Sequence, residues 1–305
     1  MRAVAVTEKS SAPQIVDLPK PVASKGHLVV RVQASSLNGF DIAVAAGYLE
    51  GKMEYRYPVV LGKDYAGVVD SVGEEVTKFE VGDRVFGVVT IPFLRDGGIG
   101  EYVVVNEKFG ITKVPSEVDI HDAGALGLAG ATAVDSIDAL ALKPGDKILI
   151  VGANGGVGAF ATQYAIAAGA IVIATAKPGA QTDFVKSQGA HHVIDRNGDL
   201  ATQVKVIAPN GVDAILHLAG DPSPLPYLLA AEGKIASTLG FGLDKHPAAI
   251  AIMASANEKT LDRLAADVAA KRVHVPITAI FTLDQVPGAI AAFPAGTMGK
   301  QSITV

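Results

Sequence analysis

A glycine-rich loop near the middle of the chain carries the clearest chemical signal. It runs Gly152-Ala153-Asn154-Gly155-Gly156-Val157-Gly158 and follows Lys147–Val151, which reads as a buried strand. A helix is predicted over Gly156–Ala168. Glycine lets the backbone approach a phosphate, and the N–H groups at a helix start attract the negative charge. We therefore predict a dinucleotide site in which the pyrophosphate contacts Gly155, Gly156, Val157 and Gly158. The alternative is an ordinary glycine-rich turn, which would be as good an explanation if the flanking strand and helix were missing.

The end of the next predicted strand, Ala170–Ala176, indicates which dinucleotide the loop binds. NAD-binding units usually place Asp or Glu there to hold the ribose hydroxyls. Here Thr175 and Lys177 lie at the strand end, and no carboxylate follows until Asp183. A cation and a hydroxyl suit the 2′-phosphate of NADPH, so NADPH is the predicted cofactor. The alternative for Lys177 is a solvated surface charge.

Two kinds of pattern divide the sequence near Ser116. Before it, short valine-rich segments such as Leu28–Ala34 and Glu101–Val105 alternate with turn residues, which suits a small barrel-like β domain. After it, a helical pattern at His121–Leu140 leads into apolar strands that alternate with helices. This alternation predicts an α/β protein with a doubly wound parallel Rossmann sheet, covered on both faces.

Later strands of this predicted sheet add further candidates for the cofactor site. Val212–Leu218 and Lys234–Leu239 read as its fourth and fifth strands. Doubly wound sheets bind ligands at the carboxyl ends of their strands. The backbones expected at the nicotinamide end are therefore those of Ala219, Gly220, Leu239, Gly240 and Phe241.

Composition excludes several classes of function. The 305 residues are 49% hydrophobic and 19% charged, which suits a packed globular protein. The net charge of −5, without a basic block, argues against nucleic-acid binding. The chain contains no cysteine, so disulfides and thiolate nucleophiles are excluded. No signal peptide or membrane span is predicted, and a cytoplasmic location is the default expectation.

Several further motifs give the chain a family likeness. The sequence resembles the zinc-free quinone oxidoreductase branch of the medium-chain dehydrogenase/reductase superfamily, although Gly39 stands where that branch usually has Pro. The likeness extends in order over almost the whole chain. Its motifs are Ala34–Asp41 (ASSLNGFD), Pro58–Val69 (PVVLGKDYAGVV), Val81–Gly87 (VGDRVFG), Gly130–Ala133 (GATA) and Gly299-Lys300.

The resemblance implies a fold, a domain organisation and an assembly. It implies a chaperonin-10-like β catalytic domain, residues 1–117 and 275–305, with an NADPH-binding Rossmann domain, residues 118–274, inserted between. A cleft at their junction would hold the substrate. A homodimer is also implied, for which Ala248–Ala254 is a candidate edge strand.

Zinc is not expected in this chain. Zinc-dependent relatives use Cys and His ligands and read Gly-His-Glu where this sequence reads Gly62-Lys63-Asp64. A lysine there opposes a dication. His191, His192 and His217 lie at the start of a predicted strand or inside one, so packing or surface roles are favoured over metal binding. Without a metal, reduction of a conjugated acceptor is easier than oxidation of an alcohol.

The resemblance also implies roles for individual residues. Asn38 would hydrogen-bond substrate or nicotinamide, with a turn Asn as its alternative. Asp41, Tyr48 and Thr132 complete the predicted catalytic set, and each has a structural alternative. Thr132 would also lie near the nicotinamide, and Lys300 would contact cofactor or substrate. Arg196 stands where many relatives have Tyr and would suit a phosphate.

The predicted reaction is hydride transfer from NADPH to a small quinone or α,β-unsaturated carbonyl compound. Hydrogen bonds would stabilise the resulting anion, and the proton would come from Tyr48 or from water. Two alternatives stay open from the sequence. One is a free-standing enoyl reductase for carrier-bound substrates, for which no basic docking face is visible. The other is a non-catalytic NADPH-binding sensor or structural protein.

Overall fold

The computed structural model describes residues 1–239 and 246–305 and divides into two compact units. The first unit contains Met1–Ala131 and Ala256–Val305, and the second contains Thr132–Ser255. Residues 118–131 and 256–274, which the sequence analysis placed in the nucleotide domain, therefore belong to the first unit. The reason is packing. A Cβ added to Gly124 would lie 2.8 Å from Ala34, and the Thr112 hydroxyl donates to Asp262.

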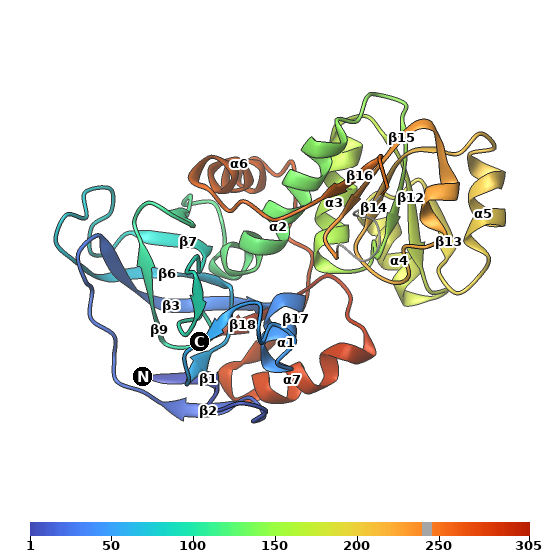
Figure 1. Ribbon diagram of the computed structural model, residues 1–305. Helices are drawn as coiled ribbons and strands as arrows, with labels where there is room; N and C mark the ends of the chain where they lie inside the picture. The colour runs from blue at the N-terminus through green and yellow to red at the C-terminus, as the bar shows by residue number, and fades with distance from the viewer. Residues whose placement is uncertain (240–245) are drawn as a thin grey trace. The chain divides into compact units, whose positions relative to one another are not determined.

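The first unit is built mainly from antiparallel strands (Figure 1). Its largest sheet has the order β10-β7-β6-β3-β18-β17, and β9 also pairs with β3. These strands are β3 (His27–Leu37), β6 (Asp64–Val72), β7 (Arg84–Val88), β9 (Tyr102–Asn106), β10 (Ile111–Lys113), β17 (Ile277–Thr282) and β18 (Lys300–Thr304). The smaller sheets contain β1 (Arg2–Val6), β2 (Gln14–Asp17), β5 (Val59–Val60), β4 (Glu54–Tyr55) and β8 (Phe93–Leu94).

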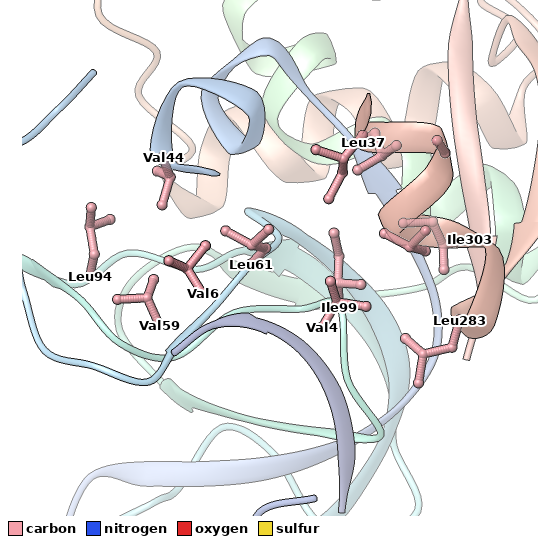
Figure 2. Close-up of a cluster of buried hydrophobic side chains, with 13 residues drawn as sticks. Val4, Val6, Leu37, Val44, Val59, Leu61, Leu94, Ile99, Leu283 and Ile303 are labelled. Atoms are coloured by element: carbon pink, nitrogen blue, oxygen red, sulfur yellow. The ribbon is translucent and has the colours of Figure 1, made fainter. Parts of the chain in front are cut away.

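The C-terminal segment returns to this sheet. β18 pairs antiparallel with the end of β3, and Gln301 lies opposite Leu37. One core of the unit lies nearby, where buried aliphatic side chains from both ends of the chain pack together (Figure 2). Its members include Val4, Leu61, Ile99, Leu283 and Ile303. Burial of this apolar surface fixes the last strand against the N-terminal strands.

Four helices complete the first unit or lead out of it. They are α1 (Gly39–Ala45), α2 (Ile120–Leu140), α6 (Glu258–Ala269) and α7 (Val286–Ala292). The chain passes from the first unit to the second within α2, at Thr132. The backbone N–H of Asn38, the residue before α1, donates to the Asp41 carboxylate at 2.9 Å. The start of α1 is fixed by this contact.

The described residues of the second unit include a parallel sheet with the order β13-β12-β11-β14-β15-β16. By chain position this is 3-2-1-4-5-6, the strand order of the Rossmann fold, and it confirms the predicted doubly wound sheet. Helices α3 (Gly156–Ala167), α4 (Ala180–Ser187) and α5 (Leu200–Ile207) run alongside it (Figure 1). The strands are β11 (Lys147–Val151), β12 (Ile171–Ala176), β13 (His192–Asp195), β14 (Val212–His217), β15 (Leu229–Ser237) and β16 (Ala249–Ala251).

The central strands of this sheet are continuous apolar runs because both faces are covered. Ile148, Leu149 and Ile150 of β11 are fully buried. At one edge lies β16, within the segment predicted as an edge strand. Among the described residues, no helix is long and apolar enough to cross a membrane.

Candidate functional site

The glycine-rich loop forms a tight turn at the carboxyl end of β11. Gly152 has φ +93°, a conformation that side-chain-bearing residues rarely adopt. The N–H of Gly155 donates to the Gly152 carbonyl at 3.1 Å, which closes the turn. The N–H of Gly152 donates to the Thr175 hydroxyl at 3.1 Å. β12 therefore supports the turn through a buried side chain.

The helix that follows presents its N-terminus at this turn. Gly155 is the N-cap residue of α3 and has no side chain to accept from the N–H groups of the first helical turn. A Cβ added to Gly158 would lie 2.4 Å from the Gly152 oxygen, so only glycine lets helix and turn pack this closely. A Cβ added to Gly155 would meet nothing closer than 3.6 Å. These residues fit a pyrophosphate, because they offer backbone N–H donors and no side chain at Gly155 blocks the approach of the phosphates.

Two cations lie at the ends of neighbouring strands in the same unit. β12 and β13 are in register with Ala176 beside Asp195, and the N–H of Arg196 donates to the Ala176 carbonyl at 3.1 Å. Lys177 and Arg196 follow directly, and both are exposed. Neither side chain takes part in an ion pair within the described part of the chain. Both charges are therefore open to an anionic ligand.

The other candidates at this sheet end have different surroundings. Thr175 is 2% exposed and holds the Gly152 turn, so it reaches a ligand only indirectly. Asp195, the last residue of β13, is an acid at the same sheet end. Its carboxylate accepts from the N–H of Asn197 at 2.9 Å.

The turns after β14 and β15 lie at the same carboxyl edge. Ala219 and Gly220 follow β14 and are exposed, and Leu239 after β15 is 38% exposed. Gly240 and Phe241 lie outside the described residues. Thr132 is buried in α2, where its backbone carbonyl accepts from the Ser136 hydroxyl at 2.6 Å. The structure thus brings the loop, the cations and these turns to one edge of a single sheet.

The first unit contains a buried polar network centred on Asp64, the first residue of β6. One carboxylate oxygen, Oδ2, accepts from Ser36 Oγ at 2.5 Å and Asn38 Nδ2 at 2.8 Å, and lies 3.3 Å from Lys300 Nζ. The other, Oδ1, accepts from the N–H of Leu128 at 2.7 Å. Asp64 is 0% exposed, and this full set of donors offsets the cost of burying its charge.

Asn38 and Lys300 are joined inside this network. Lys300 is 2% exposed, and its ammonium donates to Asn38 Oδ1 at 2.7 Å. The Asn38 amide nitrogen donates to Asp64. The Asn38 amide therefore uses both its oxygen and its nitrogen within the unit. The Lys300 ammonium is likewise engaged with Asn38 and Asp64, so it is not positioned for the ligand contact that the sequence predicted.

Two further titratable residues, Asp41 and Lys63, lie beside the network. Asp41 accepts from the N–H groups of Asn38 and Lys63, at 2.9 and 3.0 Å. Burial, with the nearby Asp64 charge, raises the pKa of Asp41 to about 7. Burial lowers the pKa of Lys63, whose ammonium donates to the Val89 carbonyl at 2.6 Å. A small cavity of about 20 Å³ is lined by both residues and by Phe40, Ile91 and Phe93.

Tyr48 stands apart from these groups. Its side chain is 74% exposed, and it lies in the turn after α1, where its N–H donates to the Ala43 carbonyl at 2.9 Å. Sequence reasoning missed Ser36 and Asp64, although both lie in quoted motifs. Their role comes from partners 26 to 236 positions away, which local spacing does not reveal.

Comparisons with known proteins agree with this two-part architecture. Residues 24–116 match the family model described as alcohol dehydrogenase GroES-like domain, and residues 156–266 match the one described as zinc-binding dehydrogenase. The fold is similar to the solved structure of the quinone oxidoreductase from Coxiella burnetii, with a TM-score of 0.89 and 26% identity, over 100% of this chain and 99% of that one.

Two curated relatives align over most of the chain. The chloroplast envelope quinone oxidoreductase homolog of Arabidopsis thaliana is 35% identical over 67% of this chain and 63% of its own length. The quinone oxidoreductase of Lama guanicoe is 31% identical over 72% of this chain and 66% of its own. The chain thus matches slightly less than two thirds of each relative. Together with the two family models, these similarities show that the chain belongs to the quinone oxidoreductase branch of the medium-chain dehydrogenase/reductase superfamily.

Proposed function

We propose that this protein is an NADPH-dependent oxidoreductase that reduces a quinone or an α,β-unsaturated carbonyl compound without zinc. The observation that carries the proposal is the pair of exposed cations, Lys177 and Arg196, on adjacent strand ends beside the Gly152–Gly158 turn. The acceptor class is supported by the relatives named as quinone oxidoreductases.

The second unit offers a complete set of groups for the cofactor. The N–H groups at the start of α3 would hold the pyrophosphate, and Lys177 with Arg196 would hold the 2′-phosphate. The exposed backbones at Ala219, Gly220 and Leu239 would meet the nicotinamide end. When bound, NADPH supplies the two electrons of the reduction as a hydride.

Zinc chemistry does not suit the donor set of this chain. A catalytic zinc in a related dehydrogenase needs thiolate or imidazole ligands, and the sequence has no cysteine. At the position of a family His ligand, Lys63 holds its ammonium against the Val89 carbonyl. Among the described residues there is no group of three or more His, Cys, Asp or Glu that would hold a metal ion.

The first unit would then act through fixed hydrogen-bonding groups. Asn38 and Asp41 hold the start of α1 in one conformation, because their polar atoms are engaged with each other, with Lys63 and with the Asp64 network. The exposed hydroxyl of Tyr48, or solvent water, would return the proton to the reduced acceptor. Tyr48→Phe separates these two proton sources. Turnover should fall in this variant if Tyr48 donates the proton, and should stay unchanged if water does.

The test is cofactor consumption against a panel of acceptors. NADPH oxidation is followed with a benzoquinone, an enone and a saturated ketone, before and after treatment with a zinc chelator, and NADP⁺ reduction is followed with alcohols. We expect turnover with the quinone or the enone, little with the ketone or the alcohols, and no change after chelation. Turnover confined to alcohols, or lost to the chelator and restored by zinc, would contradict the proposal.

A further inference from the structure

His217 is a fully buried polar residue at the carboxyl end of β14. In the sheet it lies beside Val151, the residue before the Gly152 turn, and beside Ser237, the last residue of β15. Its imidazole is therefore surrounded by the three strand ends that lead into the candidate cofactor site. An imidazole buried there is costly to the fold unless both ring nitrogens have partners.

Both nitrogens do have partners, and the partners lead to two different turns. His217 Nε2 lies 3.1 Å from the Gly220 carbonyl, and Nδ1 lies 3.0 Å from Ser237 Oγ. The hydroxyl of Ser237 in turn accepts from the N–H of Leu239 at 3.2 Å. The imidazole and the hydroxyl thus connect the turn after β14 to the turn after β15.

The direction of two of these hydrogen bonds follows from chemistry. A carbonyl only accepts, so Nε2 carries the proton and donates to Gly220. A backbone N–H only donates, so Ser237 Oγ accepts from the N–H of Leu239 while it shares a hydrogen bond with Nδ1. Gly220, His217, Ser237 and Leu239 are thus joined in one hydrogen-bonded relay. The relay then fixes the Gly220 carbonyl and the Leu239 N–H relative to one another.

We propose that His217 and Ser237 are positioning residues for the nicotinamide half of the cofactor. This inference rests on the proposed function, because the two turns matter only if a cofactor binds at this edge. Ala219, Gly220 and Leu239 are exposed, while His217 and Ser237, which hold their backbone, are buried. An exposed backbone binds a ligand well only when it is held in the right place before binding, and the relay supplies that restraint.

The alternative is a buried polar pair that only stabilises the sheet. The two roles are separated by comparing ligands that reach different strand ends. In the proposed site NADPH would span from Lys177 to the residues after β14 and β15, whereas 2′,5′-ADP contains only the adenosine and phosphate half. A positioning role predicts that loss of the relay weakens the binding of NADPH far more than the binding of 2′,5′-ADP. A purely structural role predicts equal losses for both.

The experiment is titration of wild type, Ser237→Ala and His217→Phe with both ligands. We expect the Kd for NADPH to rise roughly 5- to 50-fold in each variant, while the Kd for 2′,5′-ADP stays within about twofold. His217→Gln keeps a donor and an acceptor and should recover part of the NADPH affinity. Asp213→Asn is the matched control, because Asp213 accepts from the N–H of Lys147 at the opposite end of β14.

Each result has a distinct meaning. Unchanged NADPH affinity in both relay variants, or equal weakening of both ligands in soluble and folded Ser237→Ala, would overturn the positioning role. Failure of the wild type to bind NADPH at all would instead overturn the proposed function. If His217→Phe does not fold, Ser237→Ala still decides the question, because it removes the hydroxyl from a strand end without adding volume.

Discussion

The side-chain oxygen of Asn38 accepts a hydrogen bond from the ammonium of Lys300 at 2.7 Å, and the same ammonium lies 3.3 Å from the Asp64 carboxylate. Asn38 precedes α1, and Lys300 begins the last strand of the protein. One buried cation therefore ties the C-terminal strand to Asn38, the candidate catalytic residue at the start of α1. The stability of the fold and the position of Asn38 depend on the same contact.

Removal of this cation should be strongly destabilising. Lys300→Met leaves Asp64 buried with one charge uncompensated, and breaking a buried pair in this way costs about 3–5 kcal/mol of the free energy of unfolding. The double variant Lys300→Met/Asp64→Asn should regain part of the loss, because it removes the remaining charge. Chemical denaturation measures both. Lys25→Met, at an exposed ion pair with Glu75, is the control and should change stability far less. A loss no larger than that of the control would contradict the role given to Lys300.

Asp41 should make the stability depend on pH. Its pKa is raised from 3.8 to about 7, mainly by burial and then by the Asp64 charge. Between these values the folded protein binds a proton that the unfolded chain releases, so the free energy of unfolding falls as pH rises. Relative to Asp41→Asn, wild type should lose up to about 1.4 kcal/mol per pH unit within this window.

Denaturation at pH 5, 6, 7 and 8 measures this difference. Asp199→Asn is the control, because hydrogen bonds from Thr202 lower the pKa of Asp199 and keep it ionised throughout that range. The free energies of unfolding of wild type and Asp199→Asn should therefore differ by the same amount at every pH. A constant difference for Asp41→Asn as well would show that the buried carboxyl does not titrate there.

Two glycines of the loop should respond differently to alanine. At Gly158 the new Cβ would press on the backbone of Gly152 and Ala153, at 2.4 and 2.6 Å, so Gly158→Ala should cost about 1–3 kcal/mol of stability. At Gly155 the nearest atom is 3.6 Å away, and the φ of −82° suits alanine. Gly155→Ala should leave thermal stability nearly unchanged and weaken NADPH binding, because the methyl group occupies the approach of the pyrophosphate. Unchanged binding by Gly155→Ala would place the phosphates elsewhere.

The fold could be predicted because its main signals are local. Strands such as β11 and β12 are continuous apolar runs, and glycine-containing turns separate them from helices. The helices α5 and α6 went unpredicted, although their caps are visible in the sequence. Asp199 accepts from Ala201 and Thr202 at the start of α5, and Asn257 accepts from Thr260 at the start of α6.

The site could be predicted only in part. The loop and Lys177 lie on consecutive elements of one strand–helix–strand unit, so their spacing is informative, whereas Arg196 was predicted only from the resemblance. The buried network is different, because Lys300 reaches Asn38 and Asp64 only after the last strand pairs with β3. His217 gave no signal beyond a polar residue in an apolar strand, and its partner Ser237 comes from the neighbouring strand.

The central claim is tested most directly by the relative affinity for NADPH and NADH. Both are titrated into wild type, Lys177→Ala, Lys177→Ala/Arg196→Ala and the control Lys186→Ala, which alters a lysine at the last turn of α4. Wild type should bind NADPH roughly 5- to 150-fold more tightly than NADH at low salt, because a 2′-phosphate gains charge-assisted contacts that a hydroxyl does not. Added salt should reduce the difference in affinity between the two cofactors, because it screens the contact with the 2′-phosphate. Lys177→Ala should weaken the binding of NADPH and leave that of NADH nearly unchanged. Equal affinities in wild type, or equal losses of both cofactors in Lys177→Ala, would contradict the account.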